Sequence, residues 1–157
     1  RPEIDDEVIV GFINGNPKDA IVLGMMNSSA KPAPITASDD NHEKGFVTRS
    51  EMKVIFNDDD ISMTLETPNG NKMVISDADG GIKLEDENGN FIEMNSEGIT
   101  IESATAINYK SGTDTTIESG TNLDIKAGTQ LKAEGAAGAE VSTGAIAILK
   151  GSLVQIN

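Results

Sequence analysis

The chain has 157 residues, of which 37% are apolar and 3% aromatic, with no Trp, no Cys and a formal net charge of −14. So acidic a protein is repelled by nucleic acids and by anionic membrane surfaces, which argues against binding to either, and the lack of Cys excludes a disulfide framework. Scarce aromatics disfavour a compact globule and favour an elongated repeat in which each unit packs only on its neighbours.

Residues 1–27 predict a small β unit. Val8, Val10 and Phe12 alternate with their neighbours as in a strand, and Asn14-Gly15-Asn16-Pro17 predicts a turn. Ala20-Ile21-Val22-Leu23 is a second short apolar strand. Because two strands alone are unstable in water, we expect this piece to be the end of a domain that begins outside the sequence.

Residues 28–48 predict an extended neck, and residues 46–98 a run of short strands. The neck is rich in small polar residues and contains Pro32 and Pro34. Turn signals then recur about every nine to ten residues, which indicates many short strands. The alternating apolar positions are Met52, Val54, Phe56, Ile61, Met63, Leu65, Met73, Ile75, Ile82, Leu84, Ile92 and Met94.

From Gly98 onward the sequence repeats every eight residues. Each octad has two mostly apolar positions two residues apart, the inward face of a very short strand, followed by two small residues that allow a tight corner. The strongest inward positions are Ile99, Ile101, Ile107, Tyr109, Ile117, Leu123, Ile125, Leu131, Val141 and Leu149. In the last octad, Ile146 and Ile148 compete with the inward pair.

The octad also carries charges of alternating sign beside the corner. Its fifth positions read Glu102, Lys110, Glu118, Lys126, Glu134, Ser142 and Lys150. We expect them to point outward and to disfavour a slip of one rung, which would bring like charges together.

The octad period predicts a trimer. Eight residues make one strand and one corner, hence one wall of a prism, and about three walls are needed to enclose a core. A single chain would show a 24-residue period, which the sequence lacks, whereas three identical chains each giving one wall make every octad equivalent. The fold class expected is therefore all-β, an intertwined trimeric β-helix whose isolated chain exposes its inner stripe.

Several segments together resemble the Vgr spike family of contractile injection systems, which includes the VgrG proteins of type VI secretion and the spikes of phage-tail-like particles. Residues 1–26 resemble the end of the family's OB-fold barrel, residues 31–50 its neck, and residues 52–77 and 82–103 the start of its β-helix. Residues 145–157 resemble its C-terminal tip. One departure is Asp5, where members often have Gly.

The resemblance implies a structural, membrane-piercing homotrimer with an OB-fold remnant at 1–27, a neck at 28–48 and a spike at 49–157. A PAAR-type protein would cap the tip, formed by Ser152, Leu153, Val154, Gln155, Ile156 and Asn157. A tail-tube protein would bind regions outside this chain, effectors would ride on the spike, and the protein would act in an extracellular particle or secretion apparatus of bacteria.

No catalytic, cofactor or metal site is expected. The single histidine, His42, lies in the polar neck, and one His without Cys cannot build a nucleophile–base pair. Asp77, Asp79, Asp86 and Asn88 match neither an EF-hand nor a calcium β-roll, which favours turns. Two alternatives remain: a trimeric tail-fibre or adhesin stalk, and a monomeric calcium β-roll.

Overall fold

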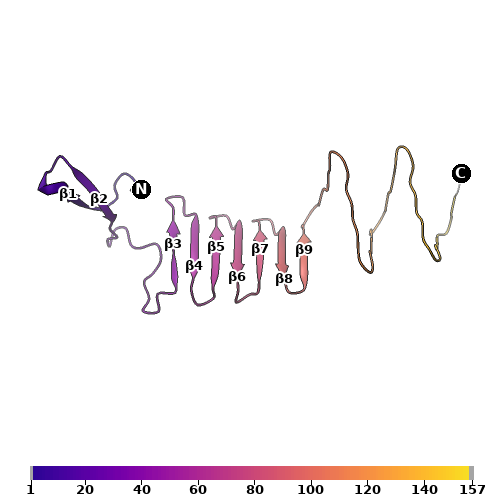
Figure 1. Cartoon of the computed structure of the whole chain (residues 1–157), viewed down its shortest axis with the longest axis horizontal. Coiled ribbons are helices and arrows are strands. Elements are labelled where there is room, and N and C mark those ends of the chain that lie inside the picture. Colours follow the sequence, from indigo (N-terminus) through magenta and orange to yellow (C-terminus); the bar gives the residue numbers. More distant parts are fainter. Residues whose placement is uncertain (1, 156–157) are drawn as a thin grey trace. The chain divides into compact units, whose positions relative to one another are not determined.

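A computed structural model of the chain describes residues 2–155, and their secondary structure is almost entirely β (Figure 1). Two units can be separated, Arg1–Tyr109 and Lys110–Asn157. All nine strands of the described residues lie in the first unit, and the one helical element there is a short 3-10 turn. The predicted all-β class is confirmed.

The first two strands form the expected hairpin. Strand β1 (Val8–Phe12) pairs antiparallel with β2 (Ala20–Met25), and a short 3-10 turn, η1 (Ile13–Gly15), follows β1. Apolar side chains occur on both faces of this hairpin, and Ile9, Phe12 and Leu23 are about half or more exposed. A hairpin of two strands with apolar side chains on both faces is marginally stable by itself, and its membership of a larger domain stays a prediction.

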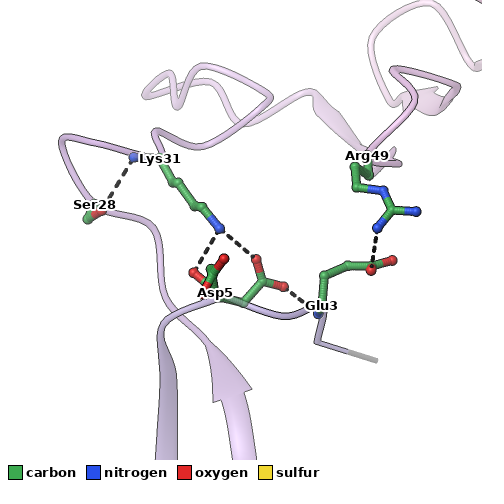
Figure 2. Close-up of polar contacts among 6 residues, drawn as sticks. Glu3, Asp5, Ser28, Lys31 and Arg49 are labelled. Carbon is green, nitrogen blue, oxygen red and sulfur yellow. Dashed lines mark hydrogen bonds and ion pairs between the residues drawn. The ribbon is translucent and has the colours of Figure 1, made fainter.

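Polar contacts close the base of the hairpin, as Figure 2 shows. The Lys31 ammonium donates to the Asp5 carbonyl oxygen at 2.8 Å and to the Asp6 carboxylate at 3.3 Å. The backbone N–H of Glu3 donates to the other Asp6 oxygen and is the main cause that lowers the pKa of Asp6. Asp5 has a φ of 74°, a conformation that glycine adopts without strain.

The remaining strands form one antiparallel meander, ordered as in the sequence. They are β3 (Glu43–Val47), β4 (Lys53–Asn57), β5 (Ser62–Glu66), β6 (Lys72–Ser76), β7 (Gly81–Glu85), β8 (Phe91–Asn95) and β9 (Gly98–Glu102). Strand β3 lies inside the range 28–48 assigned to the neck. The sheet thus begins at Glu43, because Glu43–Val47 pair residue by residue with β4.

The meander follows a 19-residue repeat that the sequence analysis did not detect. Strands β4, β6 and β8 begin at Lys53, Lys72 and Phe91, and β3, β5 and β7 follow the same spacing. At one edge, Thr48, Thr67 and Asp86 each close a turn by accepting a backbone N–H four residues later. The residue types differ while the hydrogen bond is the same, and this conceals the repeat in the sequence.

The opposite edge has four-residue turns that end in a left-handed residue. Ile61 and Gly80, 19 residues apart, have φ values of 48° and 67°. The expectation that Ile61 belongs to the alternating strand residues is wrong, because it occupies the turn and β5 begins one residue later. The last turn, Ser96-Glu97, is shorter by two residues, and the octads begin directly after it.

Candidate assembly interface and tip

One face of the seven-stranded sheet is apolar in every strand, with Lys44 of β3 as its one charged residue. Because alternate side chains point to opposite faces of a strand, the cross-strand register defines which residues share a face. Two rows make up this face, which we name the apolar face: Phe46, Val54, Leu65, Met73, Leu84, Ile92 and Ile101, and beside them Phe56, Met63, Ile75, Ile82, Met94 and Ile99. Every alternating pair predicted within the strands lies on it.

The opposite face of the sheet is largely polar and suits contact with water. Lys53, Glu66, Lys72 and Glu85 alternate in sign along one cross-strand row. The Lys83 ammonium donates to the Glu85 carboxylate at 2.9 Å, and this hydrogen bond raises the pKa of Lys83. Opposite charges across strands stabilise this register by about 0.2–1 kcal/mol per pair.

A single chain cannot bury its apolar face. Among the described residues no hydrophobic side chain is fully buried, and Phe46 is 74% exposed. The accessible surface is 14190 Å² for 16.5 kDa, whereas a compact monomer of this mass exposes about 7,500 Å². The excess exceeds the roughly 2,000–5,000 Å² of an obligate interface, so the chain is built to associate.

The backbone follows the octad repeat closely. Bends begin at the second small residue of each predicted corner: Ala104, Gly112, Gly120, Gly128, Ala136, Gly144 and Ser152. Between the bends the chain is extended, and residues 104–155 are all exposed. The repeat predicted from the sequence is thus a repeat of the backbone as well.

All ten predicted core side chains are exposed in the single chain. The exposed fraction ranges from 45% at Ile107 to 93% at Val141. The set is Ile99, Ile101, Ile107, Tyr109, Ile117, Leu123, Ile125, Leu131, Val141 and Leu149. Ile146 and Ile148 are exposed too, so the phase of the last octad stays open, and contacts between the ten side chains and other copies remain a prediction.

Ile99 and Ile101 connect the two halves of the interface. Both lie in β9 on the apolar face, opposite Met94 and Ile92, and both are the inward pair of the first octad. The apolar face and the octad stripe are therefore continuous at this point.

A polar latch fixes the junction between sheet and octads. The side-chain oxygen of Asn90 accepts the Ser103 hydroxyl at 2.8 Å and the Ala104 backbone N–H at 3.0 Å. Asp86 holds Asn90 by accepting its side-chain N–H₂ at 2.6 Å and its backbone N–H at 2.9 Å. These bonds, led by that from the Asn90 side chain, lower the pKa of Asp86. Sequence reasoning missed the latch because Asn-Gly-Asn reads as an ordinary turn.

The described part of the predicted tip has two exposed apolar side chains. Leu153 and Val154 are 80% and 51% exposed, and Ser152 lies at the last bend. Gln155 is also exposed, while Ile156 and Asn157 fall outside the described residues. Cap binding at these six positions remains a prediction.

The acidic residues considered for calcium do not come together. Asp77 and Asp79 lie in the turn between β6 and β7, whereas Asp86 and Asn88 lie in the next turn, at the other edge of the sheet. Within residues 2–155 no three His, Cys, Asp or Glu side chains are grouped to hold a metal. His42 is partly buried before β3, and its carbonyl oxygen accepts the Asp58 N–H at 3.0 Å.

No helix in the described part of the chain has the length and apolarity needed to cross a membrane. The polar face of the sheet is hollowed by about 490 Å³ around Thr64 and Val74, with Lys72, Lys83 and Glu93 at its margins.

Comparison with known proteins agrees with this geometry. The family model described as phage baseplate V C-terminal trimerisation domain matches residues 62–157, and no curated protein gives a significant match. The matched range contains β5–β9 and all the octads. A trimerisation domain accounts for an apolar face that one chain leaves exposed, and it makes the protein a homotrimer with a structural role in a baseplate-type particle. The chain belongs to the phage baseplate V C-terminal trimerisation domain family.

Proposed function

We propose that the trimer is the central spike of a contractile injection system, of the Vgr type found in type VI secretion and phage-tail-like particles. The observation that carries the proposal is the apolar face of the sheet from Phe46 to Ile101, whose last pair is also the inward pair of the first octad. A face that is followed in the sequence by further octads of the same pattern suits the core of a trimeric spike. The resemblance of residues 1–50 to the barrel end and neck of Vgr spikes supports this type.

The trimeric β-structure is proposed to begin at Glu43. This start lies before residue 62, where the family match begins, and before residue 49, where the sequence pattern predicts the spike to begin. Phe46 and Val54 continue one row of the apolar face into β3, while Phe56 begins the other row opposite Lys44. Residues 1–27 are proposed to complete an OB-fold barrel, and residues 28–42 to form the neck. Both hairpin faces are apolar, which supports a barrel built with further strands.

The tip is proposed to bind a small PAAR-type cap through residues 152–157. Leu153 and Val154 are 80% and 51% exposed in the single chain. A cap over the tips of the three chains would remove these apolar side chains from water, which supports the proposal. Effectors and a tail-tube protein are proposed to attach outside the segments described here.

The proposed mechanism is mechanical. Thrust along the needle is borne by interchain backbone hydrogen bonds and by the dry core, so that a sheath can drive the spike through an envelope without chemistry. Residues 104–154 belong to no strand within one chain, and they are proposed to pair with other copies.

Two measurements test the proposal. Light scattering after size exclusion should give about 50 kDa, three chains of 16.5 kDa. The trimer should also bind a purified PAAR-type protein at one cap per trimer, and Val154→Asp should abolish this binding without dissociating the trimer. An intact trimer that binds none of the PAAR-type proteins tested would favour the alternative, a trimeric fibre or adhesin stalk. Such a stalk has the same trimeric shaft but no cap protein at its tip.

A further inference from the structure

The left-handed isoleucine at position 61 is an unexpected feature of the sheet. Ile61 has a φ of 48°, in a region that β-branched residues rarely occupy because the side chain crowds its own backbone. The loop geometry requires this conformation, since Gly80 has a φ of 67° at the equivalent position of the next hairpin. Glycine therefore satisfies the backbone, and an isoleucine at the same position needs another reason.

The backbone around Ile61 is held from both sides. The Asn57 side chain accepts the N–H groups of Asp59 and Asp60 at 2.9 and 3.2 Å. The Ile61 carbonyl oxygen accepts the Asp77 N–H from the neighbouring turn at 3.2 Å. The residue consequently cannot relax into an ordinary conformation without breaking contacts between two turns.

The side chain of Ile61 adjoins the apolar face at its margin. Together with Phe56, Met63 and Ile75 it lines a shallow hollow of about 340 Å³, and those three residues form one row of the apolar face. Ile61 nevertheless remains 65% exposed. An exposed apolar side chain in a strained conformation gains nothing within its own chain.

We propose that Ile61 is a contact residue between copies of this chain, seated against the neighbouring protomer at the margin of the apolar face. The occupant is a second copy, because the hollow continues the face that the trimerisation domain must cover. Burial of Ile61 by that copy then offsets the backbone strain. Gly80 lacks a side chain, so the contact is made at this turn and not repeated at the next one.

A pair of substitutions separates the contact from simple strain. Asn adopts left-handed backbone more readily than Ile and adds no glycine flexibility to the unfolded chain. If Ile61 has no partner, Ile61→Asn relieves strain and raises the midpoint of thermal unfolding of the trimer. If Ile61 is buried by a neighbour, the same change lowers the midpoint. Glu51→Asn is the matched control, since Glu51 is polar, exposed and left-handed at a φ of 62°.

Thiol labelling supplies a second measurement that does not depend on stability. The chain has no Cys, so a single introduced thiol reports one position only. In the native full-length trimer we expect Ile61→Cys to react with a maleimide at least tenfold more slowly than Glu51→Cys, and both to react alike after unfolding. A raised unfolding midpoint for Ile61→Asn, or equal labelling of the two thiols in the native trimer, would overturn the proposal.

Discussion

Leu65 and Thr64 offer a direct test of which face of the sheet is covered. They are adjacent in β5, but Leu65 lies on the apolar face between Val54 and Met73, and Thr64 on the polar face between Ile55 and Val74. Replacing either one by Asp adds the same charge to the same strand. In the single chain Leu65 is 37% exposed, so an Asp there could keep water contact if no copy covered it.

The expected loss at Leu65 is large. Losing a buried leucine costs about 2 kcal/mol, and an uncompensated buried carboxylate costs several kcal/mol more. Threefold symmetry multiplies this to the order of 15 kcal/mol, at or above the roughly 5–15 kcal/mol that stabilises a typical domain. We expect Leu65→Asp to abolish the trimer and Thr64→Asp to shift stability by less than about 1 kcal/mol.

Light scattering after size exclusion reads out both variants, and urea unfolding followed by circular dichroism measures the smaller effect. The reasoning fails if Leu65→Asp elutes as a stable trimer. It fails equally if Thr64→Asp dissociates to the same extent, because the two faces would then be equivalent.

Three further changes test other parts of the argument. Ile117→Asp should abolish trimerisation while Thr116→Asp on the alternate side of the chain should not, as light scattering will show; an intact Ile117→Asp trimer contradicts the inward assignment. The pKa of Asp86 is lowered in the folded protein from an ordinary value of 3.8. The ionised carboxylate therefore stabilises the folded protein above that pH, and this stabilisation is lost as the pH falls through the folded pKa. Unfolding experiments at different pH values should show a loss of stability below about pH 4 that is weaker in Asp86→Asn. Gly45→Ala should cost about 1–3 kcal/mol, because an added Cβ would lie 2.2 Å from the Val54 carbonyl oxygen, whereas Gly24→Ala, with open space around it, should be nearly neutral in the same assay.

Local patterns in the sequence predicted the strands and the corners well. The hairpin at β1 and β2, the alternating pairs of β4–β8 and the bends from Ala104 to Ser152 all appear where residue spacing places them. Each depends on a property of neighbouring residues, either the alternation of side chains along a strand or small residues at a tight corner. Such properties can be predicted from one segment of the sequence without knowing which strand it pairs with.

The features that sequence reasoning missed depend on pairing instead. Strand β3 was assigned to the neck because Glu43-Lys44-Gly45 reads as polar chain, and only the register with β4 makes it a strand. Ile61 looked like a strand residue because its left-handed conformation is imposed by contacts between two turns. The Asn90 latch joins residues 13 and 14 positions apart, a distance at which a single sequence gives no signal.

The two halves of the interface differ in what they require from other copies. In the meander, the strands from β4 to β7 pair with their neighbours at all five residues within the chain. This pairing forms because each turn reverses the chain and places the next strand beside the last one. Only the apolar side chains there need cover. In the octads the corner does not reverse the chain onto itself, so residues 104–154 are exposed and form no strand within one chain. The Asn90 latch lies at the boundary, and Ile99 and Ile101 keep one face in phase across it. The meander can therefore hold its strand register before association, whereas the octads gain their register only from the other two chains. If assembly begins at the meander, the octads of the three chains start to pair in matching register.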